Sequence, residues 1–239
     1  MAIVELKVPS ILKRAANVSC FFILLVAFNS CQIVRSLKEL GLEKSRIKEI
    51  PYSNKKILFM PMHHLGKQAF FDDVKIKLDS LRKIGYVIFY EGIGTGAKGA
   101  LKDTLNRKER KLMGLSTTSS GYKQAVKDTP MENYVAQDNK KILQINIDQN
   151  VDVTLKDILT VYEHKYRPIV LTDYDFRTPL DSAYTGKKQL KKSENGYITK
   201  DYRNRFVADY IKSSKYEKIV IVFGFAHYKG MKKELNKKS

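Results

Sequence analysis

The sequence predicts an α/β fold in which a mixed or mostly parallel sheet is flanked by helices, with a crevice at the carboxyl ends of the strands. Two observations lead to this fold class. Apolar runs of the length of buried strands occur at 55–64, 86–92 and 218–223, and such runs are typical of parallel strands. An amphipathic pattern at 70–85 lies between the first two runs. The chain therefore contains a β–α–β unit, which joins parallel strands.

Other patterns supply the remaining elements. Three amphipathic stretches predict helices, a fourth apolar run predicts a strand, and two polar stretches predict loops. In order, these are helices over 100–114, 153–166 and 199–214, a strand over 167–175, and loops over 115–141 and 181–199. Thr154 is the expected N-cap of the second of these helices.

The N-terminal residues are typical of a secretory signal. Lys13 and Arg14 precede an apolar run over 18–28, which is too short to span a bilayer as a stable helix. The run is followed by "NSCQ", which resembles the lipobox of bacterial lipoproteins. We therefore expect Cys31 to be the acylated first residue of the mature chain. The alternative is an ordinary apolar segment at the start of a soluble protein.

This interpretation divides the chain into a lipoprotein signal peptide over 1–30, a tether over 31–50 and a single α/β domain over 51–239. It places the protein in the bacterial cell envelope, attached to the membrane through its lipid. The sequence has two cysteines. Cys20 would leave with the signal and Cys31 would carry the lipid, so we expect no disulfide in the mature chain.

The formal net charge of +19 favours anionic partners such as lipid headgroups, acidic glycans or nucleic acid. The lysines are spread along the whole chain, and no zinc-finger, RNP or helix-turn-helix pattern accompanies them. We therefore interpret the charge as the solvated surface of a membrane-attached protein, and we do not expect nucleic acid as a partner.

Three of the four histidines lie near the predicted ends of strands. His63 and His64 follow the strand at 55–64, His227 follows the strand at 218–223, and Glu91 closes the strand at 86–92. Side chains at the carboxyl ends of parallel strands can converge. Two imidazoles and a carboxylate are a usual ligand set for a divalent metal. The alternative for His227 is a core histidine that caps a turn. The fourth, His164, is expected to be exposed on its helix.

Three segments in this order resemble the TraB/TIKI superfamily, which is recognised by two G-x-x-H motifs, a glutamate after the second strand and an Arg-Asn pair. They are "MHHLGKQAFFDDVKIKLDSLRKIGYVIFYEGI" (62–93), "YRNRFVADYI" (202–211) and "KIVIVFGFAHYKGM" (218–231). The second G-x-x-H motif is intact from Gly224 to His227. The first lacks its glycine, because Pro61 stands three positions before His64.

The resemblance implies a metal-dependent hydrolase of the peptidase type that acts on a peptide or protein. His64, with His63 as the alternative, would bind Mn²⁺, Co²⁺ or Zn²⁺ together with His227 and Glu91. Glu91 would otherwise be the general base. Arg203 would stabilise an oxyanion or hold a substrate carboxylate, and Asn204 and Gly224 would belong to the binding site. The alternative for Glu91 and Arg203 is an internal ion pair.

Two other interpretations stay open. "GTGAKG" (94–99) matches G-x-G-x-x-G, but no acidic residue follows at the distance that a dinucleotide site requires. We interpret it as a flexible glycine loop beside Glu91. A function of a different class is also possible: a non-catalytic lipoprotein that uses the same crevice to bind haem, a peptide or an anionic glycan.

Overall fold

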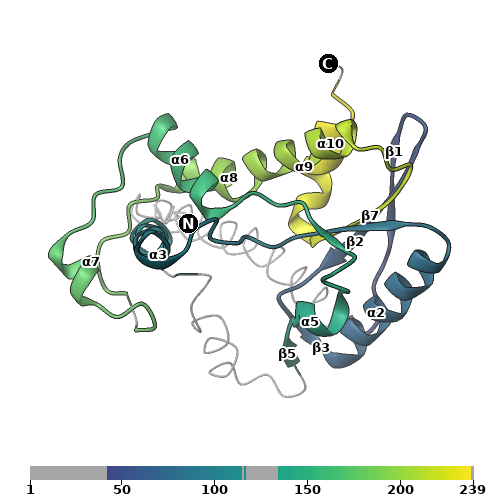
Figure 1. Ribbon diagram of the computed structural model, residues 1–239, viewed down its shortest axis with the longest axis horizontal. Helices are drawn as coiled ribbons and strands as arrows, with labels where there is room; N and C mark the ends of the chain where they lie inside the picture. Colours follow the sequence, from purple (N-terminus) through teal and green to yellow (C-terminus); the bar gives the residue numbers. More distant parts are fainter. Residues whose placement is uncertain (1–41, 115, 117–133, 183, 238–239) are drawn as a thin grey trace, which may run out of the picture. The chain divides into compact units, whose positions relative to one another are not determined.

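The computed structural model describes residues 42–114, 116, 134–182 and 184–237. Its centre is a five-stranded sheet in the order β1-β2-β7-β4-β6 (Figure 1). Neighbouring strands are parallel except β1 and β2, which are antiparallel. The strands are β1 (Lys48–Tyr52), β2 (Lys55–Met62), β4 (Val87–Tyr90), β6 (Gln149–Asn150) and β7 (Lys218–Gly224). The predicted α/β class with a mixed, mostly parallel sheet is confirmed.

The last strand in the chain, β7, lies between β2 and β4. Ile219 pairs with Ile57 on one side and with Val87 on the other. Because β7 has strands on both sides and helices over both faces, its residues from Ile219 to Phe223 are all buried, as expected for a parallel strand. The carboxyl ends of β2, β7 and β4 therefore lie at the same edge of the sheet.

Helices cover both faces of this sheet (Figure 1). One face packs Ile219, Ile221 and Phe223 against α9 (Tyr202–Ser213) and α10 (Tyr228–Leu235). The other face lies toward α2 (Gln68–Lys83), which connects β2 to β4 and buries four residues, Phe70, Phe71, Val74 and Leu78. The predicted helix between the first two strands and the predicted strand at the end of the chain are thus both present.

A second hydrophobic cluster lies between α3 (Gly99–Met113) and α6 (Leu155–Lys165). Leu112 of α3 and Ile158 of α6 are among its buried residues. The predicted N-cap of α6 is confirmed, because the Thr154 hydroxyl accepts a hydrogen bond from the Asp157 backbone N–H and the Asp157 carboxylate accepts one from the Thr154 N–H.

Several short elements complete the described part. They are a two-stranded sheet of β3 (Leu65–Lys67) and β5 (Tyr134–Ala136), the helices α5 (Asn139–Ile142), α7 (Asp173–Arg177) and α8 (Lys192–Gly196), a π-helical turn over Tyr197–Asp201, and a 3₁₀ turn over Phe225–His227. Among the residues with a described structure, no helix has the length and apolar character that a membrane span requires.

The structure differs from three predicted elements and one predicted boundary. The loop predicted over 115–141 contains β5 and the start of α5 among its described residues. The strand predicted over 167–175 is wrong: the segment is irregular up to α7, and its Val170 is 65% exposed. The loop predicted over 181–199 contains α8 and the start of the π-helical turn. The sheet begins at Lys48, inside the predicted tether. The predicted signal peptide, with Cys31, lies outside the described residues.

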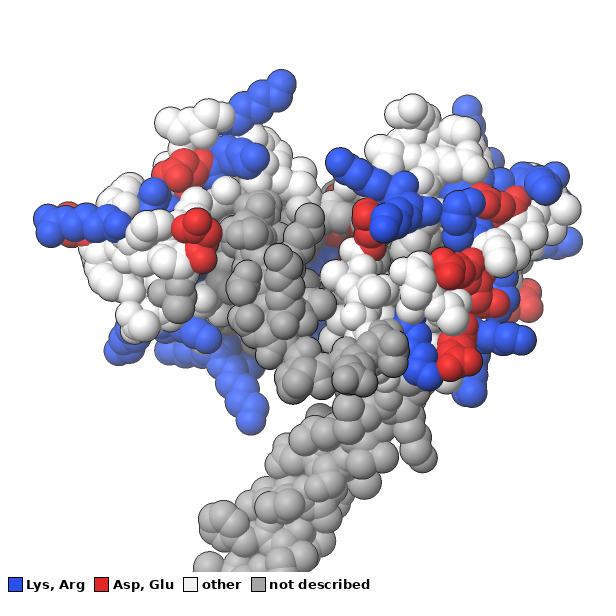
Figure 2. All heavy atoms as spheres, turned by 90° about the horizontal axis from the view of Figure 1, so that it is seen from below, with Lys and Arg blue, Asp and Glu red and all other residues white. Residues whose placement is uncertain are grey.

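Basic side chains are distributed over the surface with acidic ones among them. On the face shown in Figure 2, Lys and Arg lie over many parts of the molecule, with Asp and Glu between them. Some of these lysines are in ion pairs along a single helix, as Lys75 is with Asp79 and Lys77 with Asp73 on α2. These pairs are partly exposed to solvent, and pairs at the surface contribute little to stability.

Candidate functional site

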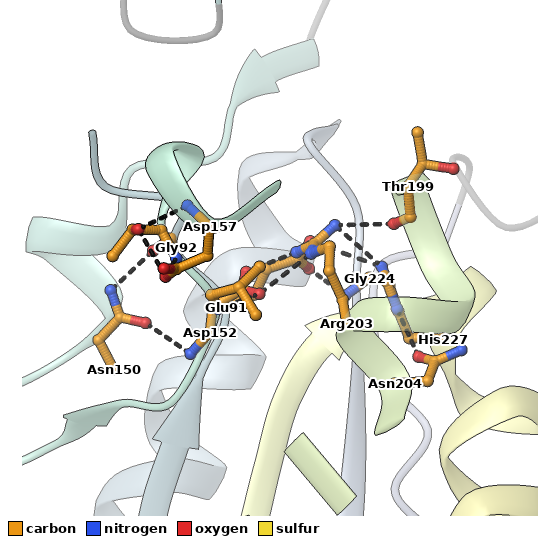
Figure 3. A network of polar contacts seen from close by, with 12 residues as sticks. Glu91, Gly92, Asn150, Asp152, Asp157, Thr199, Arg203, Asn204, Gly224 and His227 are labelled. Carbon is orange, nitrogen blue, oxygen red and sulfur yellow. Dashed lines mark hydrogen bonds and ion pairs between the residues drawn. The ribbon is translucent and has the colours of Figure 1, made fainter. Parts of the chain in front are cut away.

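A network of polar side chains lies where the parallel strands end (Figure 3). Glu91 directly follows β4, and its backbone N–H continues the ladder by donating to the Val222 carbonyl of β7. Gly224 ends β7, and Asp152 follows the short strand β6. Because these strands are parallel, their carboxyl ends bring the three residues to one edge of the sheet, which is where α/β proteins bind ligands.

The carboxylate of Glu91 bridges β7 and α9. Its Oε2 accepts a hydrogen bond from the Gly224 N–H at 2.6 Å, and its Oε1 accepts one from Nη2 of Arg203 at 2.5 Å. A Cβ atom on residue 224 would lie 3.3 Å from Oε2, so a glycine allows this close approach. Burial raises the pKa of Glu91, but the charge of Arg203, the proximity of His227 and the hydrogen bonds from Gly224 and Arg203 together outweigh it, so the net effect lowers the pKa. Glu91 is therefore ionised at neutral pH.

Arg203 projects from the first turn of α9 into the centre of the network. Its Nε and Nη2 bind both oxygens of Asp152, at 3.0 and 2.5 Å, in the bidentate geometry that makes Arg–carboxylate pairs strong. Only 7% of the Arg203 side chain and none of the Asp152 side chain is exposed. Nη1 donates to the Thr199 carbonyl at 3.2 Å and lies 3.3 Å from Nε2 of His227.

The ring nitrogen of His227 that points away from Arg203 is hydrogen-bonded to a residue of α9. Its Nδ1 lies 2.7 Å from Oδ1 of Asn204, so Nδ1 carries the proton and donates it to the amide oxygen, which leaves a lone pair on Nε2. Nε2 is 3.7 Å from Oε1 of Glu91. Burial and the nearby charge of Arg203 lower the pKa of His227 to about 4. The imidazole is therefore neutral at neutral pH.

The arrangement is a neutral base beside a fixed ion-pair cluster. Glu91 and Asp152 are two carboxylates, Arg203 is one cation between them, and His227 is uncharged, so the cluster carries a net negative charge. Nε2 of His227 and Oε1 of Glu91 both have lone pairs, and both face the same guanidinium. A water or hydroxyl group placed between them could transfer its proton to His227.

Five of the residues predicted for the site lie together: Glu91, Arg203, Asn204, Gly224 and His227 (Figure 3). The ion pair between Glu91 and Arg203, which was the alternative interpretation of these two residues, is present. Asp152 is a member that sequence reasoning missed. It follows a strand of only two residues, and that length leaves no periodic signal to predict the strand or its end.

The two histidines after β2 have different surroundings. His63 is buried, and its ring packs against Phe70 and against Phe225 of the G-x-x-H motif, with ring centroids 5.2 and 5.6 Å apart. His64 is exposed, and its backbone carbonyl accepts a hydrogen bond from Gln137. The described residues contain no group of three or more His, Cys, Asp or Glu side chains that could hold a metal ion. Neither histidine therefore completes such a set with Glu91 and His227.

The glycine loop between β4 and α3 packs against the start of α6. The carbonyls of Gly94 and Thr95 accept hydrogen bonds from the Leu155 and Lys156 N–H groups. Gly96 has a φ of +69°, and a Cβ there would lie 2.9 Å from Thr154. Gly96 thus allows the loop to pack closely against the amino end of a helix. His164, on the same helix, is exposed, as expected.

A separate hollow of about 590 Å³ lies at the other edge of the sheet, near the amino ends of β4 and β6. Arg82, Tyr86, Asp148 and Tyr216 are among the residues that line it. Arg82 is already bound by both oxygens of Asp148. The hollow contains none of the residues of the network at the carboxyl ends of the strands.

Comparisons of this chain with protein-family models, with curated proteins and with solved structures found no match. The resemblance to the TraB/TIKI superfamily consequently stays a prediction from the motifs, and the chemistry of the site has to be argued from its own geometry.

Proposed function

We propose that this protein is a hydrolase that cleaves a carbonyl-centred bond in a peptide or protein, at the network formed by Glu91, Arg203 and His227. The observation that supports this proposal is the neutral imidazole of His227, fixed in one tautomer by Asn204, with Nε2 facing Glu91 and Arg203 at the strand ends. The motif resemblance to TraB/TIKI hydrolases agrees with it. We also propose that the chain is attached to the bacterial cell envelope through a lipid on Cys31.

In the proposed reaction, Nε2 of His227 accepts a proton from a water molecule as the water oxygen attacks the carbonyl carbon. The bond to the leaving nitrogen then breaks, and the proton passes from His227 to that nitrogen. The carboxylate of Glu91, 3.7 Å from Nε2, stabilises the imidazolium that forms between the two steps. Asn204 maintains the orientation of the ring through its hydrogen bond to Nδ1.

Arg203 differs from the role that the resemblance implies. A guanidinium has five N–H donors, and the five of Arg203 face the two Asp152 oxygens, Glu91, the Thr199 carbonyl and His227. No donor is left for a substrate oxyanion in this arrangement. We therefore propose that Arg203 positions Glu91 and His227 and does not bind the substrate itself.

The test is a cleavage screen on the full-length chain purified in detergent, with quenched fluorescent peptide libraries and denatured casein as substrates. We expect His227→Ala to lower kcat by about 100-fold or more, the usual contribution of a general base. Glu91→Gln is expected to lower kcat with a smaller change in KM. His164→Ala, on the exposed surface of α6, is the control and keeps the wild-type rate. Equal rates in the wild type and His227→Ala would contradict the proposal.

The hydrogen bonds within the network also support a second candidate function. The site's charged groups bind one another, and such a cluster also fits a protein that uses its crevice only to bind a ligand such as haem, a peptide or an anionic glycan. This candidate predicts no turnover in the screen. It also predicts saturable binding of one such ligand, measured by haem absorbance or by fluorescence anisotropy, that His227→Ala weakens and His164→Ala does not.

A further inference from the structure

The position between the two carboxylates at the end of the sheet is taken by a side chain. Nη2 of Arg203 lies 2.5 Å from Oε1 of Glu91 and 2.5 Å from Oδ2 of Asp152, so one nitrogen bridges both acids. A divalent ion shared by two carboxylates would need the same oxygen atoms. We propose that Arg203 is the resident cation of this site and that the site takes no divalent metal ion. This inference concerns the same residues as the proposed active site. Only its consequence for catalysis rests on the proposed function.

The carboxylate oxygens that a metal would need already accept hydrogen bonds. Oε2 of Glu91 accepts from the Gly224 N–H, and both oxygens of Asp152 accept from Arg203. Nδ1 of His227 donates to Asn204, and Nε2, the proposed proton acceptor, lies 3.3 Å from Nη1 of Arg203, so a metal ion bound at Nε2 would lie beside that cation. This arrangement agrees with the finding that the described residues contain no group of three or more His, Cys, Asp or Glu side chains that could hold a metal ion.

The charge of Arg203 is a second reason to expect no divalent metal ion at this site. A guanidinium cannot lose its proton in a protein, so it cannot make way for a metal by becoming neutral. Arg203 is also fixed in the site, because Asp152 binds it at two atoms through a carboxylate side chain that is completely buried. A divalent ion beside the two acids would therefore lie next to a buried positive charge, which is electrostatically unfavourable. Asp152 is the positioning residue that keeps the guanidinium in place.

The first measurement is metal content by elemental analysis. The full-length wild type and His227→Ala are incubated with Mn²⁺, Co²⁺ and Zn²⁺ in turn and then dialysed. We expect the two proteins to retain the same amount of each ion, well below one equivalent. About one equivalent of any of these ions in the wild type, lost in His227→Ala, would overturn the inference.

The second measurement tests whether the two acids depend on the cation. Arg203→Met leaves Glu91 and Asp152 buried without their partner, and we expect the melting temperature to fall by about 10 °C. Adding Asp152→Asn removes one of the two buried charges and should restore part of that loss. Arg205→Met, at an exposed position of α9, is the control and should leave the melting temperature unchanged.

The comparison between the single and the double variant decides this second measurement. A double variant that is no more stable than Arg203→Met would contradict the inference. If Arg203→Met shows no melting transition, a transition in the double variant supports the inference and its absence in both contradicts it. Neither measurement uses activity. A metal-free protein without turnover would thus retain the inference and reject the hydrolase, whereas a metal-bound protein with turnover would do the reverse.

Discussion

His227 is buried and carries no proton on Nε2. The free energy needed to keep this imidazole neutral in the folded protein depends on pH. The pKa of this imidazole falls from 6.5 to about 4 on folding. Between these two values the unfolded chain binds a proton that the folded chain does not bind. The free energy of unfolding is therefore highest above pH 6.5 with respect to this group, and it decreases as the pH falls toward 4.

We accordingly expect the free energy of unfolding to fall by up to about 3 kcal/mol between pH 7 and pH 4 through His227, since one pKa unit corresponds to about 1.4 kcal/mol. Glu91, whose pKa is also lowered, adds a loss at the acidic end of this range. The measurement is urea unfolding at a series of pH values for the wild type and for His227→Gln. The variant should show the shallower dependence between pH 6.5 and 4, and parallel curves would contradict the assignment.

At the scale of elements, the site depends on how closely α10 approaches α9. A Cβ atom on Gly230 of α10 would lie 2.0 Å from Nδ2 of Asn204 on α9, which is closer than real contacts allow. The glycine therefore lets Asn204 reach Nδ1 of His227. A contact between the two helices thus fixes the tautomer of the proposed base.

Gly230→Ala should displace Asn204 and lower the free energy of unfolding by about 1–3 kcal/mol, the usual result of overpacking. Replacing glycine by alanine within a helix otherwise stabilises it by about 0.5–1 kcal/mol. Gly196→Ala in α8, where nothing lies within 4 Å of the new Cβ, is therefore the matched control and should be neutral or stabilising. Thermal unfolding followed by circular dichroism measures both, and equal effects would rule out the steric explanation.

The long elements with clear periodicity could be predicted from the sequence, and the short ones could not. The apolar runs that became β2, β4 and β7 have the length and burial of central strands. The apolar stretch before α7 misled the prediction, although Thr172 and Asp175 have the spacing of a helix start. In the structure, the Thr172 N–H and hydroxyl both donate to the Asp175 carboxylate, and the segment does not join the sheet.

The sequence could predict those residues of the candidate site that are polar and directly follow an apolar strand. Glu91 and His227 follow apolar runs, so the topology of parallel strands indicates that they converge. Asp152 and the hydrogen bond between Asn204 and His227 depend on tertiary packing, which local patterns do not encode. Local patterns also could not decide between His63 and His64. Adjacent residues at the end of a strand point to opposite sides of the sheet, and only tertiary packing determines which side faces the site.

For the molecule as a whole, the proposed attachment to the membrane rests on the N-terminal motif. We expect the mature protein to begin at Cys31 and to carry lipid there, which metabolic labelling with palmitate and mass spectrometry of the N-terminal peptide would measure. Cys31→Ser should abolish the label. Cys20→Ser, within the predicted signal, is the control and should retain it. Lipid on a protein that lacks Cys31 would contradict the proposal.

The central place of β7 has a consequence for biosynthesis. Before residues 218–224 are synthesised, β2 and β4 have no strand between them, and each has an unpaired edge. Synthesis of the last strand joins the two halves and supplies Gly224 and His227 in the same step. The nascent chain therefore cannot complete either its sheet or its site until its final segment emerges. A chain that lacks this strand therefore has two unpaired strand edges and lacks two residues of the polar network.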